Sequence, residues 1–168
     1  MSTSICLRTL LPAEHILLLP TCQSKKRAFE QATLLLENVS GMPRDELFSL
    51  FMQREQKNST SIGFFGAIPH LHMNVKEPLC VLTRLQQPIQ YDADNAPTSL
   101  VHTLFFLIVP EKASKMHLKL LSIFSHILAD ENCMAQIADC VDAAAIHKVI
   151  ADWEVAQHSV LEAIWTVE

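Results

Sequence analysis

Basic charge and long apolar runs are both scarce in this sequence, and each scarcity excludes a class of protein. The 13 lysines and arginines are outnumbered by 18 aspartates and glutamates, so the net charge is −5. A duplex-binding protein needs a concentrated basic face, and the short run "SKKR" at 24–27 does not supply one. The apolar stretch from Leu100 to Val109 is far shorter than the ~20 residues that span a bilayer. We therefore expect no nucleic-acid partner and no membrane insertion.

Paired cysteine motifs are absent as well. The five cysteines form no CxxC pair, and an odd number of them indicates free thiols in a reducing compartment. Residues 1–20 contain neither a basic leader followed by a sustained apolar run nor a small-residue cleavage site. We therefore expect a cytoplasmic protein without a catalytic cysteine.

Several motifs that carry familiar chemistry are missing. The sequence has no GxSxG elbow, no GxxxxGK[ST] loop and no GxGxxG fingerprint. Neither a serine-hydrolase site nor a bound nucleotide is indicated. We expect no cofactor.

What is present is the composition of one globular domain. Hydrophobic residues make up 49% of the 168-residue chain and charged residues 18%, which is a balance typical of a folded protein with a single core. Apolar spacing and turn residues predict helices over 24–41, 43–54, 116–129, 130–138 and 142–165, and strands over 62–68, 79–85 and 99–110. The turn-rich residues 91–98 read as a loop. Helices flanking a few buried strands predict a layered α/β domain spanning 1–168.

His70 is the most informative histidine. Two of the three glycines, Gly63 and Gly66, lie within eight residues before it, and Pro69 directly precedes it. Glycine permits unusual backbone angles, and proline fixes one angle and removes a donor. These residues would hold an imidazole in a set direction at the end of a strand.

The other histidines admit plainer interpretations. A lone histidine is usually a surface or hydrogen-bonded core residue, and we assign that role to His15, His102, His126, His147 and His158. His72 lies two residues after His70 and would share its strand face. This spacing leaves open a metal site formed by His70, His72 and His117, although the HxH pattern is weak.

Seven short stretches together resemble one family. They are "CQSKKRAFE" at 22–30, "QRE" at 53–55, "NSTSIG" at 58–63, "AIPH" at 67–70, "QQPIQYDADNAP" at 86–97, "LIVP" at 107–110 and "HLKLLS" at 117–122. Their order and spacing over about residues 5–155 resemble the EIIA proteins of the phosphoenolpyruvate-dependent phosphotransferase system (PTS), in the fructose and mannitol superfamily. Within it, the sequence is most similar to the stand-alone nitrogen-regulatory type, IIA-Ntr.

The resemblance implies roles for three residues. It places His70 where the family carries its phosphoryl group, which comes from an HPr-type phosphocarrier protein charged by Enzyme I from phosphoenolpyruvate. It places His117 beside the phosphorylated ring and Arg54 near the site. It also implies a mixed β-sheet flanked by helices on both faces, and no metal.

Elementary chemistry agrees with these roles. A neutral imidazole is a competent nucleophile near neutral pH, and phosphoryl transfer mainly requires positioning and charge stabilisation. A phosphohistidine adds roughly two negative charges, which a guanidinium and a second imidazole N–H can offset. His117 is expected at the start of a helix, where free backbone amides also favour an anion.

The sequence departs from the family's usual pattern at two places. "IGFFGAIPH" has Phe64 and Phe65 where an asparagine and a glycine are common, and Leu71 to Met73 replace a glycine and a basic residue. The loop that meets the phosphodonor is therefore bulkier and less basic, and exposed aromatic rings there could form a docking surface.

The expected function is that of a phosphocarrier and regulator in the nitrogen-type PTS. Phosphorylation of His70 would decide which regulatory targets it binds, such as potassium-transport or sensor proteins. The alternatives are the IIA component of a fructose or mannitol sugar PTS, an interaction module that acts without phosphorylation, and a small metalloenzyme using the three histidines named above.

Overall fold

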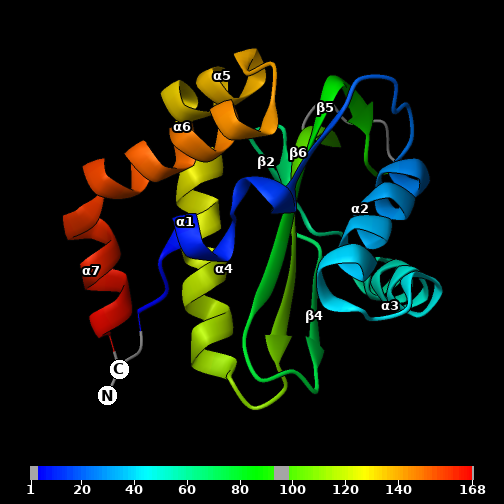
Figure 1. The fold of residues 1–168 in the computed structure, drawn as a ribbon, viewed down its shortest axis with the longest axis horizontal. Coiled ribbons are helices and arrows are strands. Elements are labelled where there is room, and N and C mark those ends of the chain that lie inside the picture. The colour runs from blue at the N-terminus through cyan, green and yellow to red at the C-terminus, as the bar shows by residue number, and fades with distance from the viewer. Residues whose placement is uncertain (1–3, 93–98, 168) are drawn as a thin grey trace.

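A six-stranded mixed β-sheet stands between two layers of helices in the computed structural model, which describes residues 4–92 and 99–167 (Figure 1). The strands are β1 (Ile16–Leu19), β2 (Ser61–Gly63), β3 (Gly66–Ala67), β4 (His70–Met73), β5 (Leu79–Gln90) and β6 (Leu100–Pro110). β6 pairs with β5 antiparallel and with β3 and β4 in parallel, whereas β1 pairs with β5 in parallel and β2 with β3 antiparallel. The fold is the expected α/β domain with helices on both faces of a mixed sheet.

The helices divide between the two faces. They are α1 (Leu7–Leu10), α2 (Lys25–Ser40), α3 (Arg44–Lys57), α4 (Ser114–Ala129), α5 (Glu131–Asp139), α6 (Ala143–Ala156) and α7 (His158–Thr166), with a 3₁₀ turn at Ala13–His15. α2 and α3 cover one face, and α1 and α4 to α7 cover the other (Figure 1). β6 is buried on both sides as predicted: Phe105 and Leu107 pack into one core, and Leu104 and Phe106 into the other.

Aromatic contacts hold the two helices that matter most for the site. On one face, Phe106 of β6 meets Phe29 of α2 and Phe51 of α3, with ring centroids 4.9 and 5.4 Å apart. On the other face, Phe105 stacks on Phe124 of α4 at 4.5 Å. Each such pair contributes about 0.5–1.5 kcal/mol beyond the burial of its area. The positions of α3 and α4 are thereby fixed relative to the sheet.

Local sequence rules account for four of the helix ends. Ser24 caps α2 by accepting a hydrogen bond from the Arg27 amide, and Gly41 ends it in the left-handed conformation at φ 78°. Asp130 and Asp142 cap α5 and α6 in the same way. These four boundaries can therefore be predicted from the sequence.

Several predicted boundaries were wrong. α3 runs one turn beyond Arg54, to Lys57, and α4 begins at Ser114 instead of residue 116. β5 extends to Gln90, and β1 was not predicted. Residues 93–98 of the predicted 91–98 loop lie outside the described residues.

The C-terminal segment is two helices instead of the single one predicted over 142–165. α6 ends at Ala156, the amide of its C-cap residue Gln157 donates to the Trp153 carbonyl, and α7 follows. The break allows Leu161 and Trp165 to be buried, and Lys119 of α4 donates to the Trp165 carbonyl at 2.8 Å. Burial of these two side chains favours the turn over a continuous helix.

His70 begins strand β4, whereas the sequence predicts it at the end of a strand. β3 and β4 lie one after the other along β6, separated by Ile68 and Pro69. Pro69 has no N–H to donate, but its carbonyl accepts from the Leu107 amide at 2.9 Å. The interruption places His70 at an outer strand of the sheet, between the two helical layers.

Candidate functional site

The His70 ring is oriented by its own backbone segment. Its Nδ1 lies 2.7 Å from the carbonyl oxygen of Ile68, and a carbonyl can only accept, so Nδ1 carries the proton and donates. The neutral ring therefore has its lone pair on Nε2. The nucleophilic nitrogen of this histidine is Nε2.

Arg54 lies beside that nitrogen. Its Nη1 donates to the Asn58 carbonyl at 2.9 Å, and its Nη2 is 3.5 Å from His70 Nε2. Arg54 lies in the last turn of α3, and its hydrogen bond to the Asn58 carbonyl joins it to the residue that follows the helix. A negatively charged group attached to Nε2 would meet the guanidinium directly.

His117 approaches from the other helical layer. It lies in the first turn of α4, and its ring centroid is 4.8 Å from that of His70. Its backbone amide already donates to the Ala113 carbonyl, so this amide is not the free anion donor that the sequence suggested. Its Nε2 is buried and has no hydrogen-bond partner among the described residues. The structure thus brings all three predicted site residues together at the sheet edge.

Burial and neighbouring groups favour the neutral form of both the His70 and the His117 ring. Burial lowers the pKa of His70, with further lowering by Arg54 and His72, against the opposing effects of the Ile68 carbonyl and Glu55. Burial and the neighbouring His70, His72 and Arg54 lower the pKa of His117 to about 4. At neutral pH each ring therefore has one proton and one lone pair.

His72 was not assigned a role in phosphoryl transfer from the sequence, but the structure places it in the same cluster. Its Nε2 lies 2.8 Å from His117 Nδ1, with ring centroids 4.4 Å apart. Its side chain shares a strand face with His70, while Leu71 and Met73 pack into the core on the α2 and α3 side. The alternation along the strand was a usable indication, but the partner 45 residues away was not visible in the sequence.

A buried polar network supports the segment that leads to His70. The Glu55 carboxylate pairs with Lys25 Nζ at 3.0 Å and accepts from the Thr60 amide and hydroxyl. The Thr60 hydroxyl also lies 2.8 Å from the Tyr91 hydroxyl, and the Thr60 carbonyl accepts from the Ile68 amide at 3.0 Å. Ile68 in turn accepts from His70. The network fixes the carbonyl that decides the His70 tautomer.

The tip of the β2–β3 hairpin is unusual. Phe64 and Phe65 both have positive φ, 55° and 61°, and both are exposed, at 58% and 48%. Left-handed backbone angles are unfavourable for bulky residues and typical of the Asn-Gly pair in a tight hairpin turn. Phe65 stacks on His102, with centroids 5.4 Å apart. The departure noted in the sequence is therefore a strained turn that presents two rings to solvent.

The remaining histidines have ordinary structural contacts. His15, His126 and His147 each have Nδ1 within 2.9 Å of a backbone carbonyl, His102 contacts Thr103 and His158 pairs with Glu162. Within residues 4–92 and 99–167, no group of three or more His, Cys, Asp or Glu side chains is arranged to hold a metal ion. No helix in the described part of the chain is long and apolar enough to cross a membrane.

The sequence over residues 9–153 matches the family model described as phosphoenolpyruvate-dependent sugar phosphotransferase system, EIIA 2. The chain belongs to this family. The PTS EIIA 2 family takes part in phosphoryl transfer together with phosphocarrier proteins, and this chain is a component of such a system.

Its relatives point to the nitrogen-regulatory branch. A nitrogen regulatory protein of Escherichia coli is 35% identical over 136 residues, which cover 79% of this chain and 82% of that protein. The crystal structure of IIA-Ntr from Neisseria meningitidis matches with a TM-score of 0.77 and 32% identity, over 86% of this chain and 98% of that one. A fructose-specific EIIA component of Haloferax volcanii is 28% identical over 86% of this chain and 94% of that protein. The chain is thus an EIIA protein of the IIA-Ntr-like kind.

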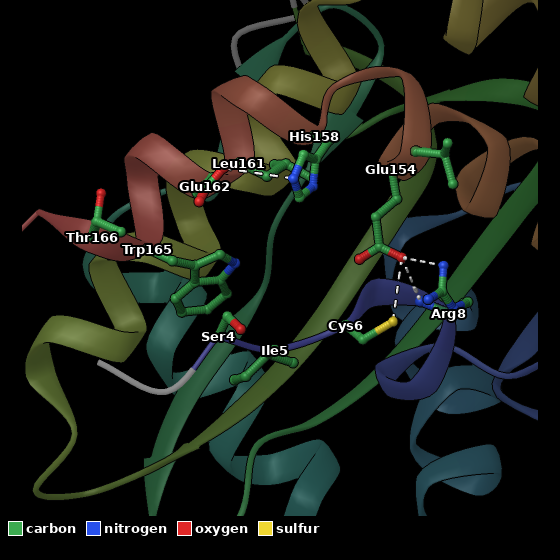
Figure 2. Close-up of a pocket in the computed structure, with 11 residues that line it drawn as sticks. Ser4, Ile5, Cys6, Arg8, Glu154, His158, Leu161, Glu162, Trp165 and Thr166 are labelled. Carbon is green, nitrogen blue, oxygen red and sulfur yellow. Dashed lines mark hydrogen bonds and ion pairs between the residues drawn. The ribbon is translucent and has the colours of Figure 1, made fainter. Parts of the chain in front are cut away.

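A hollow away from His70 lies at the other side of the molecule's described part. A cavity of about 580 Å³ opens between the N-terminal segment and α6 and α7 (Figure 2), and its lining residues fall outside the 9–153 family match. The Glu154 carboxylate points toward Cys6 and Arg8 (Figure 2), accepts from the Leu7 and Arg8 amides and pairs with the Arg8 guanidinium at 3.7 Å. This carboxylate is therefore occupied in holding the start of α1.

Proposed function

We propose that this protein is a cytoplasmic phosphocarrier of the nitrogen-type PTS that accepts a phosphoryl group on His70 Nε2 from an HPr-type carrier protein. The observation that carries the proposal is the hydrogen bond from His70 Nδ1 to the Ile68 carbonyl, which leaves Nε2 unprotonated, with its lone pair toward Arg54 Nη2 at 3.5 Å. The nitrogen regulatory relatives support the branch of the family.

The transfer is a substitution at phosphorus. The lone pair of His70 Nε2 attacks the phosphorus of the donor's phosphohistidine, and a P–N bond to Nε2 forms as the donor's P–N bond breaks. The donor imidazole leaves with that electron pair. His70 keeps its proton on Nδ1, where it is hydrogen-bonded to the Ile68 carbonyl. The lone pair on Nε2 is therefore available without a separate base.

Arg54 and His117 are the groups placed to offset the charge that arrives. The guanidinium of Arg54 is always protonated and approaches Nε2 at 3.5 Å. His117 has a buried, unpartnered Nε2 within the described residues, and a phosphoryl oxygen would give it a hydrogen-bond partner.

The regulatory output follows from the same charge change. A phosphoryl group adds roughly two negative charges to a surface that carries a guanidinium and three imidazoles. A target protein that binds this surface would distinguish the two forms by electrostatics. Phosphorylation-dependent binding to regulatory targets is the proposed role.

Intact-mass measurement tests the proposal. The purified protein is incubated with phosphoenolpyruvate, Enzyme I and the HPr-type carrier, in parallel with two variants. One is His70→Ala, and the control is His126→Ala, which removes a ring that also contacts a backbone carbonyl. We expect one acid-labile phosphoryl group on the wild type and the control and none on His70→Ala. No phosphoryl group on the wild type, with a carrier shown to be charged, would overturn the proposal and favour a module that acts unphosphorylated.

A further inference from the structure

The contact between His72 and His117 has two possible proton arrangements. With one hydrogen between His72 Nε2 and His117 Nδ1, 2.8 Å apart, either His72 donates and His117 accepts, or the reverse. Two neutral imidazoles cannot both donate to each other. The choice decides which nitrogen of His117 carries its single proton.

The two arrangements differ in what His117 offers the phosphoryl group. If His72 donates, the His117 proton is on Nε2, the buried nitrogen that has no partner among the described residues. If His117 donates, Nε2 carries a lone pair instead, and a lone pair repels phosphoryl oxygens. Only the first arrangement supplies a hydrogen bond to a phosphate on His70.

The placement of His72 suits the donor role. It is exposed on β4, so either of its tautomers can be reached through solvent. His117, in the first turn of α4, instead has its ring against those of both His70 and His72. Orientation of a functional imidazole by a hydrogen bond to its other ring nitrogen is a general device.

We propose that His72 is a positioning residue whose Nε2–H donates to His117 Nδ1 and so keeps the His117 proton on Nε2, facing the phosphoryl group of His70. The inference rests on the proposed function for its consequence, but the tautomer itself is a property of the unphosphorylated protein. It assigns a use to a residue in the stretch from Leu71 to Met73, where the sequence departs from the family's usual pattern.

The test uses ¹⁵N-labelled, unphosphorylated protein at pH 7.5, with long-range ¹H–¹⁵N spectra that report which ring nitrogen is protonated. We expect His117 protonated at Nε2 in the wild type and in the control His126→Leu, and a mixture of tautomers in His72→Leu. His72→Gln, whose amide N–H can replace the donor, should restore the Nε2–H form. A His117 protonated at Nδ1 in the wild type, or an unchanged His117 in His72→Leu, would overturn the inference.

The same variants are then compared in phosphoryl transfer from the charged HPr-type carrier. His72→Leu should be slower by about 10-fold, the effect of weakening one hydrogen bond to a charged group, and His72→Gln should be close to wild type. Equal rates in His72→Leu and wild type would contradict the positioning role. A wild type that accepts no phosphoryl group would instead refute the proposed function, while the tautomer result still decides the role of His72.

Discussion

The hydrogen bond between His70 and the Ile68 carbonyl gives this site its direction. It commits Nδ1 as a donor and leaves the lone pair on Nε2, the nitrogen proposed to accept the phosphoryl group. Arg54 and His117 then approach from opposite helical layers. The geometry of the proposed phosphoryl-transfer site therefore depends on a few side-chain contacts, and single substitutions can separate their contributions.

Replacement of Arg54 should slow phosphoryl transfer without removing the acceptor. We expect Arg54→Gln to lower the initial rate about 10- to 100-fold, because a hydrogen bond to a charged group contributes about 1.5–3 kcal/mol. The initial rate of Arg54→Lys should lie between those of Arg54→Gln and the wild type, since lysine keeps the positive charge but lacks the several N–H donors of a guanidinium. The rate is followed by intact mass over time.

The matched control is Arg27→Gln, which removes an exposed guanidinium paired with Glu30 on α2. It should transfer at the wild-type rate. An Arg54→Gln variant as fast as this control would show that the guanidinium takes no part in transfer.

His117 should make stability depend on pH. Its pKa is lowered to about 4 in the folded protein, chiefly by burial, against about 6.5 in the unfolded chain. Between these values the unfolded chain binds more protons, so the free energy of unfolding decreases as the pH falls from 6.5 to 4. His70 acts with the same sign because its pKa is also lowered.

Urea unfolding at pH 7.5 and 5.0 measures this effect. The loss of stability between the two should be smaller in His117→Gln than in the wild type and in the control His126→Gln. An equal loss in all three proteins would contradict the assigned pKa.

One turn of this fold is strained, and one helix end is capped by a buried arginine. The turn between β2 and β3 holds two phenylalanines at positive φ. The buried Arg84 of β5 donates through Nη1 to the carbonyls of Ile137, Ala138 and Cys140 at 2.7–2.9 Å. The strained turn lowers the stability of the protein, whereas the arginine provides a hydrogen-bond donor for carbonyls at the end of α5.

The turn should tolerate asparagine better than phenylalanine. A left-handed conformation costs about 1–2 kcal/mol for most residues and less for asparagine, and Phe64 is 58% exposed, so little burial is lost. We expect Phe64→Asn to stabilise the protein by about 1 kcal/mol and raise Tm by roughly 2–4 °C. Phe64→Ala removes the ring but keeps the strain, and a variant Phe64→Asn no more stable than Phe64→Ala would refute the strain argument.

Removal of the Arg84 cap should destabilise the protein. Arg84→Met leaves three carbonyls at the end of α5 without this donor, and we expect a loss of roughly 2 kcal/mol in the free energy of unfolding. Arg84→Lys, which keeps the charge, should lose less. Urea unfolding of the three proteins checks the order, and an Arg84→Met protein as stable as the wild type would show that the cap contributes nothing net.

Across the complete fold, the sheet separates two cores and meets the site at its edge (Figure 1). The layered α/β class could be predicted because helical periodicity and the long apolar run of β6 are local patterns. β1 escaped prediction because "ILLL" is only four residues long and shows no alternation. The break at Gln157 escaped it because the helical pattern continues through 142–165, and burial of Leu161 and Trp165 decides the outcome.

Some of the site residues could likewise be predicted from the sequence and others could not. His70 stood out by its glycines and proline, and Arg54 and His117 came from the resemblance to the family. The contact of His72 with His117 joins residues 45 apart, and the Glu55–Thr60–Tyr91 network joins three segments. Only folding brings these groups together, so no local pattern identifies them.

The most direct test of the account is to find which nitrogen of His70 carries the phosphoryl group. The protein is labelled with ¹⁵N, phosphorylated through the HPr-type carrier, and its histidine ring nitrogens are assigned by NMR with ³¹P coupling. The hydrogen bond to Ile68 predicts phosphorus on Nε2 and a proton retained on Nδ1. Phosphorus on Nδ1, or on a histidine other than His70, would contradict the account.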